Sequence, residues 1–340
     1  MLRELPNRLL PWFEKNRRDL PWRRDREPYH VWLSEIMLQQ TRVEAVKGYY
    51  ERFLLRLPTL EALAAAEENE LLKLWEGLGY YSRVRNLQKA AQIIVRDYGG
   101  VFPRDYESVL ALPGVGAYTA GAICSICYEQ PTPAVDGNVL RVVSRVLASD
   151  LPIGEERVKR GMARELAKHY PAGRCGDFTQ ALMELGATVC LPNGAPKCDV
   201  CPLGDVCKAK KEGTQGSYPV REEKKPRRVE RRTVFFLQCG DKIAVCKRPK
   251  TGLLAGLWQL PDAAGELTVE EILRQAEEWG VHPRNIRKTV QRTHIFTHVE
   301  WKLTCCWLDC AEENGFTWVT RRELEESIGL PTAYRQFLAE

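Results

Sequence analysis

Two carboxylates stand in sequence surroundings that suit acid catalysis and charge stabilisation. Glu35 lies within Val31-Trp-Leu-Ser-Glu-Ile-Met-Leu38, where apolar residues fall on nearly every side of a predicted helix, so we expect its carboxyl group to be partly desolvated. Desolvation raises a carboxyl pKa, and an acid still protonated near neutrality can give its proton to a leaving group at a sugar carbon. A structural glutamate paired with an arginine is the alternative interpretation, and the helix alone does not decide between them.

The second carboxylate, Asp136, occurs in Ala134-Val-Asp-Gly-Asn-Val-Leu-Arg141, immediately before a predicted helical run. An aspartate at this place is an ordinary helix N-cap. A carboxylate fixed at a helix start is also expected to remain ionised, and it could face a positive charge that develops on a sugar. Both roles can hold together, so Asp136 is a candidate for the second catalytic group.

Four cysteines have the spacing of ligands to one inorganic centre. Cys190, Cys198, Cys201 and Cys207 follow the pattern C-x7-C-x2-C-x5-C, which lets four thiolates meet. Zinc and a 4Fe-4S cluster both accept four thiolates, and the spacing alone does not separate them. The other eight cysteines are predicted to be packing residues: Cys124, Cys127, Cys175, Cys239, Cys246, Cys305, Cys306 and Cys310.

A glycine-containing turn joins two predicted helices and could bind a DNA phosphate. Leu112-Pro-Gly-Val-Gly116 lies between a helical stretch that ends near Leu112 and another over residues 117–128. Glycines let the backbone adopt open turn conformations, and amide groups at the start of the following helix can face an anion. The pattern is typical of a helix-hairpin-helix, which binds DNA without reading its sequence. A plain connection between two helices would have the same pattern.

The elements that must position these groups fall into two domains. Up to residue 209, apolar residues recur at intervals of three and four and predict an all-α body. Residues 210–232 combine Gly, Pro and dense charge and predict a solvated interdomain linker. Residues 233–340 predict an α+β domain. Its expected helix covers 269–279, and its expected strands are 233–237, 242–246, 301–308 and 316–319.

Composition and charge limit the class of protein. The chain has 340 residues, of which 44% are hydrophobic, enough for a core in each domain. No apolar run approaches the roughly 20 residues of a membrane span, and the N-terminal residues show no apolar signal region. We therefore expect a cytoplasmic monomer without membrane contact, associated with the nucleoid if the source is bacterial.

The positive charge of the chain is concentrated in one stretch. The formal net charge is +5, and residues 208–232 alone hold ten Lys or Arg against four Glu. The rest of the chain is therefore close to neutral. Affinity for a nucleic acid must then come from local patches and backbone amides rather than from a globally basic surface.

Together these blocks resemble the adenine-DNA glycosylases of the MutY type, within the helix-hairpin-helix superfamily that includes endonuclease III. The blocks that carry the resemblance occur in the family's order: Trp32-Leu-Ser-Glu-Ile-Met-Leu-Gln-Gln-Thr41, Gly77-Leu-Gly-Tyr-Tyr81, Leu112 to Thr119, Val135-Asp-Gly-Asn138 and the four-cysteine loop. The resemblance covers essentially the whole chain. It implies a multidomain protein, in which an all-α helix-hairpin-helix glycosylase domain with an iron-sulfur loop precedes an α+β Nudix-like domain.

The resemblance also implies what individual residues do. The substrate would be double-stranded DNA in which adenine is mispaired with 8-oxoguanine or with guanine. Glu35 would protonate adenine at N7 and then help to direct water, while Asp136 would stabilise the oxocarbenium-like sugar. Tyr118 and Asn138 match positions that support them around a base flipped out of the duplex. The residues that match DNA contacts are Gln40, Thr41, Tyr80, Leu112, Gly114, Val115 and Gly116, of which Gln40 and Tyr80 match residues that enter the base stack beside the lesion.

Two rival functions make different demands on these residues. A bifunctional glycosylase and lyase like endonuclease III needs a lysine amine in the hairpin to form a Schiff base, and here that position is Tyr118. We therefore expect base release with little strand cleavage. A catalytically silent DNA-damage binder would use only the hairpin and the cysteine centre, and the presence of Glu35 and Asp136 argues against it.

The C-terminal domain resembles the Nudix-like domain with which this family reads 8-oxoguanine. Phe296-Thr-His298 matches a Phe-Ser-His loop that contacts the oxidised base, and Thr297 keeps the hydroxyl group. A strand turn with a buried histidine is the structural alternative. Residues 256–261 match the approach to a Nudix box, but the metal-binding helix that should follow is incomplete. Nucleotide pyrophosphatase activity is therefore not expected, and Arg322–Glu326 is interpreted as an exposed helix face.

The first cysteine interval departs from the family pattern. It holds seven residues, Leu191–Lys197, where the family has six, so the loop must bulge by one residue. The sequence Leu-Pro-Asn-Gly-Ala-Pro-Lys contains turn formers that can absorb the extra residue. The resemblance implies a 4Fe-4S cluster, with zinc as the alternative.

Overall fold

The computed structural model describes residues 1–221 and 226–339 and divides them into two compact units. The first unit consists of Met1–Ala65 and the chain from Asn86 to Arg221. The second consists of Ala66–Arg85 and the chain from Pro226 to Ala339. The short segment Ala66–Arg85 therefore belongs with the C-terminal unit, which the sequence pattern did not indicate.

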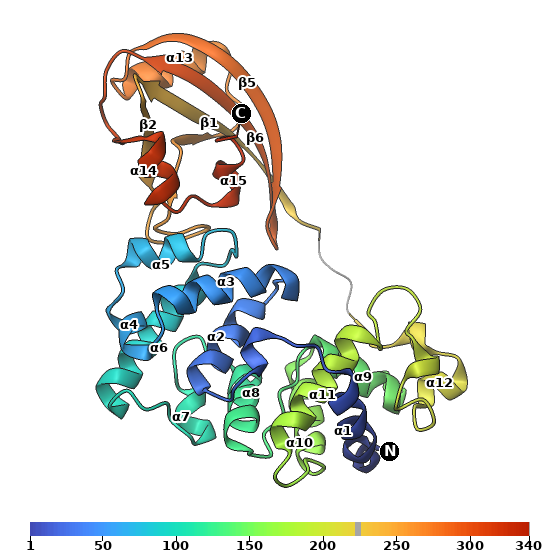
Figure 1. Cartoon of the computed structure of the whole chain (residues 1–340). Helices are drawn as coiled ribbons and strands as arrows, with labels where there is room; N and C mark the ends of the chain where they lie inside the picture. Colours follow the sequence, from blue (N-terminus) through green and yellow to red (C-terminus); the bar gives the residue numbers. More distant parts are fainter. Residues whose placement is uncertain (222–225, 340) are drawn as a thin grey trace. The chain divides into compact units, whose positions relative to one another are not determined.

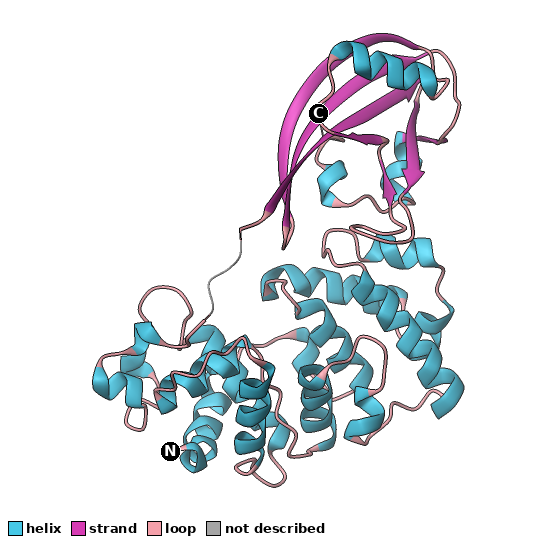
Figure 2. Cartoon of the chain, turned by 180° about the vertical axis from the view of Figure 1, so that it is seen from behind, coloured by secondary structure: helices cyan, strands magenta, loops and turns pink. Residues whose placement is uncertain are grey.

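Helices build the first unit (Figures 1 and 2), as the apolar periodicity predicted. They are α1 (Leu5–Asn16), α2 (Pro28–Leu38), α3 (Val43–Arg56), α4 (Leu60–Ala65), α6 (Ser82–Tyr98, which begins in the second unit), α7 (Tyr106–Leu110), α8 (Ala117–Tyr128), α9 (Gly137–Leu147), α10 (Glu156–Ala167), α11 (Cys175–Thr188) and α12 (Lys208–Glu212). Single 3-10 turns cover η1 (Leu2–Glu4), η2 (Pro21–Arg23), η3 (Cys198–Val200) and η4 (Gln215–Ser217). None of the described helices is both long and apolar enough to cross a membrane.

Two helical contacts in this unit decide where its functional groups lie. Helices α1, α9 and α11 share one core, in which Phe13, Val143 and Phe178 are completely or almost completely buried. Helix α2 packs against α8, and both are apolar on nearly every side, so that every residue from Thr119 to Ile126 is buried. A carboxyl group on α2 is therefore removed from water by its neighbours.

The connection between the units is shorter than the predicted linker 210–232. Helix α12 packs on α9, and the Ile153 amide donates to the carbonyl oxygen of Val220 at 3.1 Å. Strand β1 already begins at Arg228. Residues 222–225 of the predicted linker lie outside the described residues. The first part of the predicted linker is therefore packed on the first unit. Its many charged residues do not exclude such packing, because long Lys and Arg side chains can cover apolar surface while their charged ends stay in water.

The second unit is built around a mainly antiparallel sheet with helices beside it (Figure 2). Its strands are β1 (Arg228–Cys239), β2 (Lys242–Lys247), β3 (Trp258–Gln259), β4 (Asp262–Ala264), β5 (Pro283–Ile295), β6 (Val299–Cys310) and β7 (Thr317–Thr320). Its helices are α5 (Glu68–Leu74), α13 (Val269–Glu278), α14 (Arg321–Glu326) and α15 (Thr332–Arg335). The sheet order is β3-β2-β1-β6-β5, with β4 on β1 and β7 on β2, and β1 runs parallel to β6.

Side chains of the central strand β1 alternate between two cores. Val234 and Phe236 pack in one core with Trp301 and Tyr334, while Phe235 and Leu237 pack on the other face with residues of α13. This alternation follows from the two-residue period of a strand. The predicted strands at 233–237, 242–246, 301–308 and 316–319 occur as β1, β2, β6 and β7, and the predicted helix at 269–279 occurs as α13. Both α+β class and strand positions are thus confirmed.

Strand β5 was not predicted. It is an edge strand whose residues are mostly exposed, so it lacks the run of buried apolar residues that marks a central strand. Charged residues such as Arg284, Arg287 and Arg292 lie along it. Such residues are common on edge strands, where they discourage pairing with other chains.

Candidate active site and cysteine pocket

Glu35 is a buried acid whose hydrogen-bond partner is a tyrosine rather than an arginine. Only 6% of its surface is exposed, and the Tyr118 hydroxyl of α8 donates to Glu35 Oε2 at 2.5 Å. The pKa of Glu35 is raised to about 7, chiefly by burial and in smaller part by the charge of Asp136. The hydrogen bond from Tyr118 and the charge of Arg23 act in the lowering direction. Of the two interpretations of this residue, the desolvated acid is therefore the one that the geometry supports.

Asp136 caps helix α9, as its sequence context predicted. Its Oδ1 accepts the Val139 amide at 2.7 Å, and its Oδ2 accepts Asn138 Nδ2 at 2.7 Å. Burial raises the pKa of Asp136, while these hydrogen bonds act in the lowering direction. The sequence predicted that a carboxylate at this helix start remains ionised; in the structure, burial opposes the charge that the two donors favour.

A chain of hydrogen bonds connects Asp136 to the cysteine loop. Arg141 donates through one guanidinium nitrogen to Asn138 Oδ1 at 2.8 Å and through Nε to the carbonyl oxygen of Cys190 at 2.7 Å. The same side chain also donates to the carbonyl oxygen of Gly186 on α11. Asn138 is thus oriented from one side by Arg141 and from the other by Asp136. Arg141 stands in the same motif as Asp136, but the sequence alone gave it no role.

A cleft of about 580 Å³ brings the predicted catalytic residues together. Glu35, Tyr118, Asp136 and Asn138 all line it, and so do Gln40 and Thr41 from the loop after α2. A volume of this size is typical of ligand sites in proteins. The cleft is also lined by residues that sequence analysis did not single out: Arg18, Leu20, Trp22, Arg23, Val31, Ser34, Leu38, Gln39, Val43, Ile126, Val135, Gly137, Gln180, Met183, Glu184 and Ala187.

One ion network in this cleft could not have been predicted. The completely buried Glu184 accepts hydrogen bonds from Arg18 Nε at 2.7 Å and from Arg23 at 2.8 Å. The pKa of Glu184 is lowered because the donors and charges of the two arginines outweigh the opposing effect of burial. The partners are more than 150 positions apart in sequence, so no local pattern links them.

The predicted hairpin lies between α7 and α8. Gly114 has a φ of +77°, and a Cβ added there would lie 2.8 Å from the Asn86 side chain, so both conformation and space require glycine. The side chains of Leu112 and Val115 are buried. Any contact of these two residues with a phosphate must therefore use the backbone, as a helix-hairpin-helix does.

The residues predicted to read the lesion line a separate pocket within the second unit. Phe296, Thr297 and His298 form the turn between β5 and β6, and Tyr80 lines the same pocket. The Tyr80 hydroxyl and Thr297 Oγ1 are hydrogen-bonded. His298 is exposed, which rules out the alternative of a turn with a buried histidine. The ring of Phe296 instead anchors the turn, because it packs edge-on against Trp301 with centroids 4.9 Å apart.

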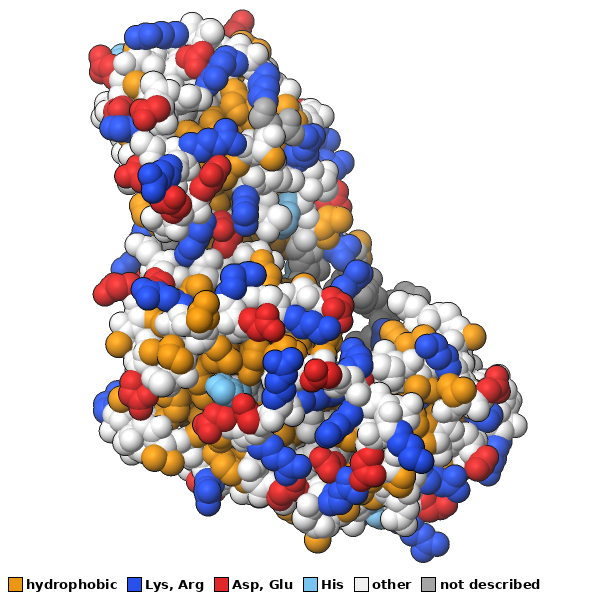
Figure 3. Space-filling view, in the orientation of Figure 1, with side chains coloured by type: hydrophobic (Ala, Val, Ile, Leu, Met, Phe, Trp, Pro, Cys, Tyr) orange, Lys and Arg blue, Asp and Glu red, His pale blue; other side chains and the backbone are white. Residues whose placement is uncertain are grey.

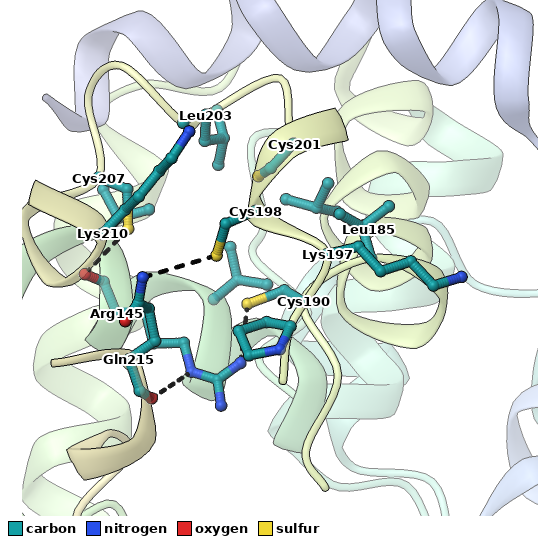
Figure 4. Close-up of a pocket in the computed structure, with 15 residues that line it drawn as sticks. Arg145, Leu185, Cys190, Lys197, Cys198, Cys201, Leu203, Cys207, Lys210 and Gln215 are labelled. Atoms are coloured by element: carbon teal, nitrogen blue, oxygen red, sulfur yellow. Dashed lines mark hydrogen bonds between the residues drawn. The ribbon is translucent and has the colours of Figure 1, made fainter. Parts of the chain in front are cut away.

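The four predicted metal ligands line one pocket (Figure 4). Cys190, Cys198, Cys201 and Cys207 surround it with Arg145, whose guanidinium donates to Cys190 Sγ at 3.2 Å. The Gln215 side chain donates to Cys198 Sγ at 3.8 Å. Donors of this kind beside the sulfur atoms can orient the ligands of a metal centre. Four soft donors with such partners fit an inorganic centre, and the seven-residue first interval does not prevent their convergence.

Charged side chains are mixed over the surface. On the face shown in Figure 3, Lys and Arg alternate with Asp and Glu on each unit. This distribution agrees with the near-neutral charge outside residues 208–232. Helix α14, which was interpreted as an exposed charged face, pairs Arg321 with Glu325 and Arg322 with Glu326 on its own surface.

Comparisons with known proteins identify both units. Residues 33–168 match the model of the HhH-GPD superfamily of base excision DNA repair proteins, and residues 233–340 match that of the NUDIX domain. A solved structure of a thermostable thymine-DNA glycosylase superposes with a TM-score of 0.57 and 29% identity, over 62% of this chain and 97% of that one. The fold and the acidic cleft thus define a base excision repair glycosylase of the helix-hairpin-helix class.

Similarity over the whole chain narrows this class. The human adenine DNA glycosylase is 37% identical over 93% of this chain and 70% of its own length. The adenine DNA glycosylase of Schizosaccharomyces pombe is 34% identical over 93% of this chain and 85% of its own. The chain belongs to the adenine DNA glycosylase family. It is therefore a DNA-binding hydrolase of N-glycosidic bonds in base excision repair.

Proposed function

We propose that the protein hydrolyses the bond between adenine and deoxyribose where adenine is paired with 8-oxoguanine, and also where it is paired with guanine. One observation carries the proposal: a buried carboxyl, Glu35, and a half-buried one, Asp136, face one cleft from different environments. The pKa of Glu35 is about 7, whereas both oxygens of Asp136 accept hydrogen bonds that favour its anion against the raising effect of burial on its pKa. We therefore assign Glu35 as the proton donor and Asp136 as the anion.

Each catalytic step can be assigned to these residues. Glu35 gives its proton to N7 of the flipped adenine, and the C1′–N9 bond breaks with its electron pair moving to the base. Asp136 stabilises the positive charge that remains on C1′ and O4′ of the sugar. Glu35, now a carboxylate, accepts a proton from water as the water oxygen bonds to C1′. Adenine and an abasic sugar result, one water is consumed, and Glu35 is protonated again.

The cleft supports hydrolysis rather than lyase chemistry. Cleavage of the strand through a Schiff base requires a neutral amine beside C1′. Within the described residues, no lysine lines this cleft, and Tyr118 offers a hydroxyl that cannot form an imine. Base release should therefore leave the sugar–phosphate backbone intact.

Recognition of the oxidised guanine is assigned to the pocket of the second unit. Thr297 is exposed at the tip of the β5–β6 turn and shares a hydrogen bond with Tyr80. A hydroxyl at this tip can accept from the N7–H that 8-oxoguanine has and guanine lacks. The ring of Phe296 packs against the buried Trp301, and this contact fixes the turn that carries the Thr297 hydroxyl.

We assign a 4Fe-4S cluster to the cysteine pocket. A single zinc ion would hold its thiolates at about 2.3 Å from one point. All four cysteines line one pocket, and a four-iron cluster accepts the same four thiolates. The similarity to adenine DNA glycosylases favours the cluster, which would fix the loop that Arg141 contacts. Measuring the iron, acid-labile sulfide and zinc content of the purified protein distinguishes the two centres.

The function is tested with three duplexes that differ only in the base opposite adenine. Single-turnover assays should release adenine opposite 8-oxoguanine and guanine but not opposite thymine, with no borohydride-trapped adduct. Tyr118→Lys, which supplies the missing amine, is the positive control for trapping. An efficient adduct with the unchanged protein would contradict hydrolysis, and equal release from all three duplexes would contradict mispair specificity. Binding without any release would favour a silent damage binder.

The rate should fall as pH rises through about 7, because Glu35 must be protonated to act. Above that pH the single-turnover rate should drop about tenfold per unit, as expected for one required proton. In Tyr118→Phe the hydrogen bond that lowers the pKa of Glu35 is lost, so the alkaline limb should move to higher pH. Rate profiles from pH 5.5 to about 9 check this, and a limb that stays in place would mean that Tyr118 does not act on Glu35.

A further inference from the structure

Helix α5 and Glu76, the second residue after its end, are docked on the C-terminal segment of the same unit. Glu76, which is only 8% exposed, accepts the Leu330 amide through Oε1 at 2.9 Å. Its Oε2 lies 2.9 Å from Lys73 Nζ and 3.4 Å from a guanidinium nitrogen of Arg335. Lys73 also donates to the carbonyl oxygen of Ile328 at 3.2 Å. One buried carboxylate thus connects α5 with two sites on the segment around α15.

The backbones at this contact approach each other closely. A Cβ added to Gly329 would lie 3.1 Å from the carbonyl oxygen of Leu72 on α5 and 3.2 Å from its carbonyl carbon. The neighbouring atoms belong to backbone, which cannot move aside as a flexible side chain could. Glycine at 329 is therefore needed for the Leu330 amide to reach Glu76. Figure 1 shows α5 beside the part of the unit that carries α14 and α15.

Glu76 also stands directly before the loop that carries Tyr80. This loop is braced internally, because Trp75 Nε1 donates to the carbonyl oxygen of Gly79 at 3.1 Å. Arg83 donates to the carbonyl oxygens of Leu78 and Gly79 at 2.8 and 3.0 Å. Because these hydrogen bonds hold residues 77–80 in one conformation, we expect the loop to shift together with Glu76. Any shift of Glu76 is therefore passed to Tyr80 and to its contact with Thr297.

We propose that Glu76 is a positioning residue for lesion recognition: its carboxylate holds the Gly329–Leu330 backbone against α5 and so sets Tyr80 against Thr297. The inference rests on the proposed role of Tyr80 and Thr297 beside the oxidised base. Glu76 does not line the catalytic cleft, so it should influence which mispair is preferred rather than the cleavage step itself. A simple structural role would instead affect all substrates alike.

The test uses the full chain with Glu76→Ala and, from the other side of the contact, Gly329→Ala. Hydrogen exchange of the Leu330 amide should accelerate at least about tenfold in Glu76→Ala, because its acceptor is lost. The ratio of single-turnover rates on 8-oxoguanine:adenine and guanine:adenine duplexes should fall about tenfold in both variants, the size expected for a lost charged hydrogen bond. The rate on guanine:adenine should stay within about twofold. Glu165→Ala, which removes an exposed carboxylate paired with Lys168 on α10, is the matched control and should change neither quantity.

The outcomes separate the inference from the function on which it rests. Unchanged exchange at Leu330 would overturn the docking role of Glu76. Faster exchange with an unchanged substrate ratio, or an equal loss on both duplexes, would overturn the positioning role. Thr297→Ala tests the lesion site itself: if it lowers the ratio while Glu76→Ala and Gly329→Ala do not, the proposed function stands and the inference fails. If Thr297→Ala leaves the ratio unchanged, the lesion site is refuted, and the inference falls with it.

Discussion

Glu35→Gln is expected to lower the single-turnover rate of adenine release by about a thousandfold or more, within the range for removing a general acid and base. Glutamine keeps the size of the side chain and can still accept the hydrogen bond from Tyr118. It cannot give a proton to N7 or take one from water. The loss should appear in the chemical step, so affinity for the mispaired duplex should change by less than about threefold.

The unfolding free energy that Glu35→Gln gains or loses relative to the unchanged protein should depend on pH in a defined direction. The folded protein holds the proton of Glu35 up to about pH 7, while the unfolded chain releases it near its ordinary pKa of 4.5. The native state therefore loses stability as pH rises from about 4.5 to about 7, by roughly 3 kcal/mol in total. Glutamine does not titrate, so Glu35→Gln should unfold at a higher temperature than the unchanged protein at pH 8 and show no such gain at pH 4.5.

Two measurements decide this prediction. Adenine release from an 8-oxoguanine:adenine duplex is followed with enzyme in excess, and thermal unfolding is recorded at both pH values. Product formation by Glu35→Gln at the unchanged rate would refute the assignment of the acid. An activity loss accompanied by equal thermal stabilities at pH 8 would show that the folded protein does not raise the pKa of Glu35.

Asp136→Asn is expected to lower the rate of adenine release by about a hundredfold to a thousandfold, as for the loss of one electrostatic contact to a transition state. Asparagine is also a good N-cap, so helix α9 should keep its start and the Val139 amide its acceptor. The negative charge opposite the sugar is what disappears. The amide group would also face the amide of Asn138, which now donates to Asp136 Oδ2.

The pH profile separates the charge of Asp136 from its structural contacts. That charge raises the pKa of Glu35, so its removal should move the alkaline limb to lower pH, opposite to the shift in Tyr118→Phe. Asn138→Ala, which removes the neighbouring amide but keeps the Asp136 carboxylate, is the matched variant and should retain the limb closer to its original place. A profile for Asp136→Asn that coincides with that of the unchanged protein would argue against electrostatic coupling of the two carboxyls.

The sequence by itself determined the elements and the kinds of residue at the site. The predicted helix over 117–128 coincides with α8, and Asp136 caps α9 as its position indicated. The pattern of four cysteines sufficed to predict that they lie around one pocket. These features are encoded by neighbouring residues, since hydrophobic period, capping and ligand spacing act over a few positions. The family blocks carried the rest of the functional prediction.

Only the tertiary structure decided which groups meet and in what state. From the sequence, Glu35 could have been a structural residue paired with an arginine. Its burial between α2 and α8 and its contact with Tyr118, 83 positions away, favour the role of a proton donor. The Arg18–Glu184 pair, the membership of Ala66–Arg85 in the second unit and the exposed edge strand β5 left no local signal either. The physical reason is that a pKa and a contact depend on the whole surroundings of an atom in space, and residues distant in sequence supply most of those surroundings.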